Sequence, residues 1–405
     1  MKTTQPTTPD PGSPPATSLE FFNTVLADTD ADGFVHVGDR FDDELRYLTR
    51  FSGPDRPYAF VYTGSEATAT LCAPRLFHEQ AQTEFIDRAS DTTHRQVRTE
   101  QVGEPAGIRA VSTLQAAGIS DGTILVPQQI PHDAALYLEQ AGYELRSTDA
   151  VTVQRQQKTP AEIGCLRCVQ QVTAAGMAQA EKILAESTEK NGVLRWSGAA
   201  LTTEVLRRQI NAILAQDGVQ PAGNTVIGAG SSAADLHFTG VEEINAGETV
   251  LIDISPRGPH GYYGDMTRTF VVEGDGGWER RAYVAVEAAL DAALRQLAPG
   301  VDAATVHEEA AAEIGAYGFP MVAEEGEIGF THGTGHGVGL SLHEPPILSR
   351  ETPLESGMVV TVEPGVYDPD RGGVRLEELV LITAAEPGYE ILAPYPRSIT
   401  PTHSR

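Results

Sequence analysis

The chain has 405 residues, a length that suggests two domains, each large enough for its own hydrophobic core. It carries 56 acidic against 29 basic residues, a net charge of −27, and such a surface repels nucleic acid and anionic membranes. No run of about 18 apolar residues could span a bilayer, and no apolar segment follows Lys2 as in a secretory signal, so we expect a cytoplasmic protein that binds neither nucleic acid nor membrane.

The acidic charge is spread along the whole chain, and lysine is nearly absent beside arginine. This composition is typical of proteins from a salt-rich cytoplasm, where screening over a few ångström makes the self-repulsion tolerable. We therefore expect a halophilic protein. An ordinary acidic protein from a low-salt cytoplasm is the alternative.

The first part of the chain predicts a disordered arm followed by an α/β domain. Residues 1–18 contain five prolines among threonine and serine, a composition typical of disorder. From residue 19 to residue 153, apolar stretches such as Tyr58–Tyr62 and Thr123–Val126 alternate with helical patterns such as Pro131–Ala141. This alternation predicts an α/β domain over 19–153.

An acidic stretch in this domain resembles the start of a calcium loop. Asp28, Asp30 and Asp32 stand at alternate positions as in an EF-hand, but the twelfth position is Asp39 in place of glutamate. Because the chain has no partner loop, we expect an acidic turn before a strand over 34–37.

The three cysteines, Cys72, Cys165 and Cys168, are an odd number that argues against a disulfide framework. The last two form a lone C-x-x-C motif in a predicted helix, which opens with a capping box from Thr159 to Glu162. A structural zinc site needs four ligands and no second pair exists, so we expect these thiols to pack in or on the helix.

The polar segment Gln154–Lys158 is the expected joint between the two domains, and the second domain follows it directly. Hydrophobic periodicity predicts three further helices there, followed or separated by strands. These helices are expected over Glu204–Gln216, Trp278–Leu297 and Asp302–Tyr317.

Four predicted strand regions of the second domain each carry one acid within or beside an apolar run. A carboxylate in a buried strand needs a partner, and four such strands in one domain fit a shared site better than four solvated faces. The acids are Asp253, Asp265, Glu363 and Glu377.

The segment 332–344 places His332, His336 and His343 among glycines. Glycines there contribute nothing to a core, so they indicate an unusual turn or a close approach to an ion or substrate. A flexible surface loop with incidental histidines is the alternative. Four converging carboxylates would repel one another unless divalent cations offset them, and oxygen ligands with one imidazole suit a pair of Mn, Co, Fe or Zn ions.

Taken in order, these acids with His336 resemble the five-ligand pattern of the pita-bread metallopeptidases. The run His332–Pro346 is most similar to the Xaa-Pro dipeptidase (prolidase) and aminopeptidase P branch, and Tyr47–Gly53 resembles its creatinase-type N-terminal domain. The resemblance implies an α+β fold, with a pita-bread catalytic domain over 157–395 and a smaller N-terminal α/β domain. In two departures, Ser255 replaces a usual glycine and the interval from Asp253 to Asp265 is one residue longer.

The resemblance implies two divalent metal ions per chain, with Mn²⁺ preferred and Co, Fe or Zn possible, and a hydroxide activated by both ions. Asp253 would bind one metal, Asp265 and Glu377 would bridge both, and His336 with Glu363 would complete the other. Glu363 would also accept the proton of the nucleophile.

The remaining polar residues would work on substrate. By the same resemblance, His343 and His237 would contact the scissile carbonyl or the product side, with His332 beside them as a third catalytic histidine. Arg375 would pair with a substrate carboxylate, although a structural ion pair with a ligand acid is equally compatible with its position two residues before Glu377.

The expected function is therefore metal-dependent hydrolysis of Xaa-Pro bonds in short proline-containing peptides, as a dipeptidase or an aminopeptidase. The expected assembly is a homodimer. A metal-independent creatinase-like hydrolase and a non-catalytic binding module on the same fold are the alternatives. Both lack part of the five-residue set in the family, whereas this chain has all five.

Overall fold

The computed structural model describes residues 15–89, 91–100, 103–221, 225–274, 277–324 and 326–402. These residues form two compact units, which divide between Arg155 and Gln156. Most of the predicted arm over 1–18 lies outside the described residues.

The N-terminal unit, residues 15–155, is built on a six-stranded sheet with the order β4-β3-β2-β1-β5-β6. Strands β1, β2 and β3 pair antiparallel, whereas β3 with β4, β1 with β5 and β5 with β6 pair parallel. The strands are β1 (Gly33–Gly38), β2 (Tyr58–Thr63), β3 (Thr68–Pro74), β4 (His94–Glu100), β5 (Gly122–Pro127) and β6 (Tyr143–Thr148). The helices are α1 (Phe21–Thr29), α2 (Asp43–Thr49), α3 (His78–Ala81), α4 (Ala106–Ala116), α5 (His132–Gln140) and α6 (Ala150–Gln156).

The N-terminal end of this unit differs from the sequence-based expectation, whereas its C-terminal end falls within the expected joint. Thr17 is buried, and its hydroxyl donates to the carbonyl of Tyr47 at 2.6 Å, so the described end of the predicted arm is packed. The two units divide between Arg155 and Gln156, inside the joint expected over Gln154–Lys158, and α6 continues to Gln156. Val151 and Arg155 of α6 are buried, so the first residues of the expected joint are helical and packed.

The acidic stretch beginning at Asp28 is a turn, as expected. Helix α1 ends there, Asp30 adopts a left-handed conformation with φ 52°, and β1 begins at Gly33. Asp32 accepts a hydrogen bond from the backbone of Thr123 at 2.9 Å, which ties the turn to β5. Its carboxylate therefore serves the packing of the sheet.

In its described residues the second unit combines four α-helices with short, mainly antiparallel strands, in agreement with the α+β class. Its helices are α7 (Pro160–Glu186), α8 (Thr203–Gln216), α9 (Trp278–Gln296) and α10 (Ala303–Ala316). The strands nearest the site are β11 (Val226–Ala229), β12 (Thr249–Ile254), β14 (Met266–Val271), β15 (His336–Gly337), β16 (Glu344–Ile347), β17 (Val359–Val362), β18 (Gly365–Asp368), β19 (Gly372–Arg375) and β20 (Glu378–Ile382). The shorter peripheral strands are β7 (Thr188–Lys190), β8 (Val193–Trp196), β9 (Ala199–Ala200), β10 (Gln220–Pro221), β13 (Pro256–Arg257) and β21 (Tyr389–Ile391).

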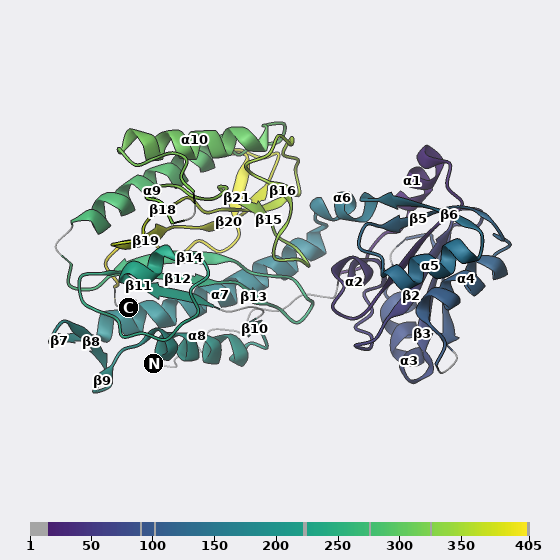
Figure 1. The fold of residues 1–405 in the computed structure, drawn as a ribbon, viewed down its shortest axis with the longest axis horizontal. Coiled ribbons are helices and arrows are strands. Elements are labelled where there is room, and N and C mark those ends of the chain that lie inside the picture. The colour runs from purple at the N-terminus through teal and green to yellow at the C-terminus, as the bar shows by residue number, and fades with distance from the viewer. Residues whose placement is uncertain are drawn as a thin grey trace, which may run out of the picture. The chain divides into compact units, whose positions relative to one another are not determined.

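The helices of this unit cover the strands from two sides (Figure 1). Helices α7 and α8 pack on the sheet β11-β12-β14 through one apolar core, whereas α9 and α10 pack on β17 to β20 through another. Each helix buries one apolar face, as the 3.6-residue periodicity predicts. The strands between the two cores are thus held rigidly, and the candidate site lies on them.

Helix α7 begins at the predicted capping box. The Thr159 hydroxyl accepts from the backbone of Glu162, and the Glu162 carboxylate accepts from the backbone of Thr159 at 2.9 Å. Cys165 and Cys168 are buried on this helix and form no disulfide. Among the helices of the described ranges, none is both long and apolar enough to cross a membrane.

Candidate metal centre

The five ligand-type side chains stand at the ends of strands that pair across the second unit. Asp253 lies in β12, and Asp265 immediately precedes β14, whose Met266 pairs with Ile254. On the other sheet, Val362 pairs with Glu378, so Glu363 and Glu377 continue from paired strand positions. Strand pairing therefore brings Asp253 near Asp265 and Glu363 near Glu377, and a backbone hydrogen bond from Glu377 to Thr267 at 3.2 Å joins the two sheets.

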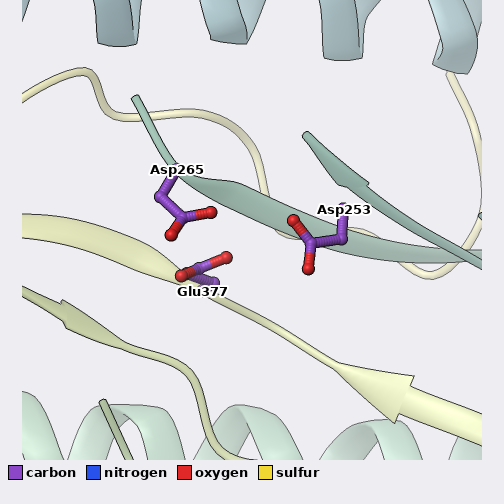
Figure 2. Close-up of side chains that lie close together, drawn as sticks. All are labelled: Asp253, Asp265 and Glu377. Carbon is purple, nitrogen blue, oxygen red and sulfur yellow. The ribbon is translucent and has the colours of Figure 1, made fainter. Parts of the chain in front are cut away.

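Three carboxylates form the centre of the site. Asp253, Asp265 and Glu377 each offer an oxygen, and these three oxygens lie within 4.8 Å of one another. Figure 2 shows the three carboxylates grouped in the space between their strands. Asp265 and Glu377 are buried, whereas Asp253 is partly exposed.

His336 and Glu363 lie on the same centre. His336 Nε2 is 3.4 Å from Glu363 Oε1 and 3.7 Å from Asp265 Oδ2. The other ring nitrogen, Nδ1, lies 3.1 Å from the carbonyl of Gly337, so a proton on Nδ1 leaves Nε2 available as a ligand. Gly335 permits this placement, because a Cβ atom there would overlap the carbonyl of Thr361.

The electrostatics of this cluster favour a bound cation. Burial, followed by the charges of Glu377 and Asp253, raises the pKa of Asp265 well above its ordinary value. Burial and the charges of Glu363 and Asp253 likewise raise the pKa of Glu377. Carboxylates in this environment resist ionisation, and a divalent cation would offset their repulsion. The donor set, four carboxylates and one imidazole, therefore fits divalent metal.

Burial also decides the state of the imidazoles. Burial is the main cause that lowers the pKa of both His336 and His332. Both rings therefore favour the neutral form, which is the form that binds metal or accepts a hydrogen bond.

The other predicted histidines line the same cavity, which has a volume of about 500 Å³. His343 and His237 are solvent-exposed, and the His343 ring lies 4.3 Å from the His336 ring. The cavity walls also include apolar side chains that could contact a substrate. These are Val226, Leu236, Leu342 and Ile347.

His332 is held by two protein groups. Its Nδ1 lies 2.7 Å from the carbonyl of Gly333 and its Nε2 lies 2.8 Å from the hydroxyl of Tyr367. A proton on Nδ1 satisfies the carbonyl, so Nε2 accepts from Tyr367. This arrangement favours a positioning role for His332 over the direct substrate contact that we expected.

Arg375 is also bound within the protein. It is 4% exposed, and its guanidinium donates to Asp253 Oδ2 at 2.5 Å, to Tyr367 Oη at 3.0 Å and to Thr267 Oγ1 at 3.2 Å. Its Nε also lies 3.8 Å from Glu363 Oε2. This geometry favours the structural alternative to a substrate contact.

Sequence reasoning missed Tyr367, whose hydroxyl contacts both His332 and Arg375. Burial raises its pKa to about 12, so the hydroxyl stays protonated, donates to His332 and accepts from Arg375. A buried tyrosine in a short strand such as β18 carries no local signal that separates it from a core residue.

Arg268 on β14 binds the backbone that carries Glu377. It is 1% exposed, donates to the backbone carbonyl of Glu377 at 2.5 Å, and forms an ion pair with Glu378 at 2.9 Å. The backbone that carries Glu377 is therefore fixed by a buried charge, and its carboxylate, which accepts from the Thr267 hydroxyl at 2.8 Å, lies in the group with Asp253 and Asp265.

These features define the class of the site as a carboxylate-rich divalent-metal centre between two sheets. The description "Metallopeptidase family M24" matches residues 164–384, which contain all five ligand-type residues, and the chain belongs to this family. Membership implies divalent metal ions, and the resemblance inferred from the motif is confirmed at this level.

Individual relatives agree with the family. Over 167 residues the chain is 40% identical to a Xaa-Pro dipeptidase of Pyrococcus furiosus, a match that covers 40% of this chain and 46% of that relative. The matched segment thus spans less than half of the relative's length. A Xaa-Pro dipeptidase structure from Bacillus anthracis superposes with a TM-score of 0.79 at 21% identity, covering 94% of this chain and 98% of the other. An X-Pro aminopeptidase structure from Thermotoga maritima superposes with a TM-score of 0.76 at 22% identity, covering 92% and 97%. The structural matches establish the pita-bread fold.

Proposed function

We propose that this protein hydrolyses Xaa-Pro peptide bonds in short peptides with the help of two divalent metal ions per chain. The observation that carries the proposal is the convergence of five ligand-type residues and three further histidines on one cavity in the family M24 segment. The names of the dipeptidase and aminopeptidase relatives support the Xaa-Pro specificity.

We propose Asp253, Asp265, His336, Glu363 and Glu377 as the metal ligands. Divalent cations supply Lewis acidity, since they polarise a scissile carbonyl and lower the pKa of water. Mn²⁺ is the proposed metal, because hard oxygen donors outnumber the single imidazole and thiolates are absent from the cavity lining.

Glu363 is the proposed proton acceptor. Burial raises its pKa above the ordinary value, with Arg375 and His332 acting in the opposite direction. A carboxylate with a raised pKa is better matched to accept a proton from the attacking water and to return it to the leaving nitrogen. The imide nitrogen of proline has no hydrogen of its own, so the delivered proton completes its departure as an amine.

The exposed histidines are proposed to position the substrate. His343 and His237 line the cavity and present ring nitrogens to a peptide carbonyl, while the apolar walls would receive the side chain of Xaa or the proline ring. Arg375 and His332 would hold Asp253 and Tyr367 in place and would not contact the substrate directly.

The setting of the enzyme is proposed from composition and family. The net charge of −27 with sparse lysine supports a salt-rich cytoplasm, and the family resemblance supports a homodimer. The same charge disfavours nucleic acid and anionic membranes as partners.

An assay on purified Mn²⁺-loaded protein tests the proposed function. We expect hydrolysis of an Xaa-Pro dipeptide or of an Xaa-Pro-Xaa tripeptide, and the ratio of the two rates separates a dipeptidase from an aminopeptidase. An Xaa-Ala dipeptide is the control for proline specificity. Turnover of creatine by chelator-treated protein would favour the creatinase-like alternative, and binding without turnover of any peptide would favour the non-catalytic one.

A further inference from the structure

A buried ion pair includes Glu344, the residue that follows the cavity residue His343 in the chain. Lys158 Nζ is 2.6 Å from Glu344 Oε1, and the two side chains are 2% and 6% exposed. Lys158 therefore binds the carboxylate of a residue that is joined by one peptide bond to His343, a residue of the cavity wall.

Further hydrogen bonds hold the backbone and the ammonium of Lys158 in place. Its backbone N–H donates to the carbonyl of Gly357 at 2.9 Å, and Gly357 in turn donates to Ile382 of β20 at 2.9 Å. The ammonium also donates to the carbonyl of Gln156 at 3.3 Å. The ammonium is therefore presented from a backbone position that lies just before α7 and is held by Gly357.

The carboxylate is packed into the glycine-rich turn of the site. Glu344 pairs with Gly337 in the β15–β16 ladder, and a Cβ atom on Gly339 would overlap the Glu344 carboxylate. Gly339 also accepts from the backbone of Tyr263 at 3.0 Å, which connects the turn to the loop before Asp265. The position of this carboxylate thus sets the path of the turn that carries His343.

A buried ion pair is not needed to stabilise the fold by itself. Apolar residues of the same volume often replace a buried ion pair without loss of stability, whereas removing one partner leaves an uncompensated buried charge. What an ion pair adds is one defined position for both groups, and here that position is next to a residue of the proposed active site.

We propose that Lys158 is a positioning residue of the active site, which orients His343 through Glu344. The inference rests on the proposed function in that the oriented imidazole serves peptide hydrolysis. It assigns a role in the site to a residue at the start of the second unit, 186 positions before Glu344 in the chain.

The test is a double-mutant cycle on Mn²⁺-loaded protein between Lys158→Met and His343→Ala. We expect Lys158→Met to lower kcat/KM for the Xaa-Pro substrate by about 10–100-fold at unchanged metal content. In the His343→Ala background the same change should cost little more, because both substitutions remove one function. Losses that multiply would overturn the proposal and leave Lys158 a purely structural residue.

Two further variants guard against a trivial result. Lys182→Met removes an exposed lysine of α7, 4.0 Å from Glu186, and should leave kcat/KM unchanged. If Lys158→Met does not fold, the double variant Lys158→Met/Glu344→Met removes both charges. We expect it to fold and still to lose activity, and wild-type activity in this variant would overturn the proposal.

A crystal structure of Lys158→Met supplies a readout that does not depend on turnover. We expect displacement of residues 339–344 and of the His343 ring, with His336 and Glu363 in place. An undisplaced turn would refute the positioning role. Absence of Xaa-Pro hydrolysis in the wild type would refute the proposed function, and the structural comparison would still decide the role of Lys158.

Discussion

Arg375 donates through Nη2 to Asp253 Oδ2 at 2.5 Å, and its side chain is 4% exposed. The guanidinium therefore orients a carboxylate of the metal centre. The planar fork of arginine holds Asp253 and Tyr367 together, which the single point charge of lysine does not reproduce.

We accordingly predict that Arg375→Lys lowers divalent-metal affinity by about 10–100-fold, because partners that orient ligands tune metal binding by that amount. At saturating Mn²⁺ the KM for an Xaa-Pro substrate should stay at the wild-type value. Isothermal titration with Mn²⁺ and steady-state kinetics on one preparation check both parts. A raised KM with normal metal affinity would instead support the substrate contact that the sequence suggested.

Removal of a proposed ligand should abolish activity. We predict that His336→Ala and Glu377→Ala each reduce Xaa-Pro hydrolysis by several orders of magnitude, because each removes one donor from the centre. Elemental analysis should give two divalent ions per wild-type chain and fewer in each variant. Near-wild-type rates in either variant would mean that the site is misassigned. His132→Ala, which changes an exposed histidine of α5 outside the cavity lining, is the matched control for loss of an imidazole.

The metal-free protein should lose stability as pH rises. The pKa values of Asp265 and Glu377 are raised above their ordinary values of 3.8 and 4.5, so the native state holds protons that the unfolded chain gives up. That contribution to stability is complete below the ordinary pKa values and disappears as pH rises through the raised native ones. Thermal denaturation of chelator-treated protein from pH 5 upward should therefore show a falling Tm.

Two comparisons isolate this effect from the general acidity of the chain. Bound Mn²⁺ takes the place of the protons, so the loaded protein should show a smaller decline. The double variant Asp265→Asn/Glu377→Gln lacks both groups and should show a smaller decline without metal. An equal decline in all three samples would assign it to the net surface charge.

High salt should stabilise the protein. The Debye length falls to about 3 Å at 1 M salt, which relieves repulsion among the 56 acidic residues and affects the buried centre little. We predict a Tm that rises by several degrees between 0.1 M and molar KCl. A Tm that falls steadily as KCl rises would contradict salt adaptation and leave the catalytic proposal untouched.

Local sequence signals, such as caps and apolar periodicity, predicted helices of the second unit. The capping box from Thr159 to Glu162 begins α7, and the apolar periodicity after Trp278 continues as α9 to Gln296. Such signals depend on residues a few positions apart, so they survive in a single sequence. The five ligand types were readable for another reason, since acids in apolar strands and histidines among glycines are costly unless they serve a site.

The contacts that assign roles within the site depend on the tertiary structure alone. Arg375 meets Asp253 across 122 positions, and Lys158 meets Glu344 across 186. No periodicity connects residues at such separations. The sequence pattern of an arginine two residues before an acid is the same whether the arginine contacts a substrate or a neighbouring carboxylate. The sequence by itself determined which chemistry the chain carries. The packing of two sheets between two helix layers decided which of those groups bind one another and which are left for metal and peptide.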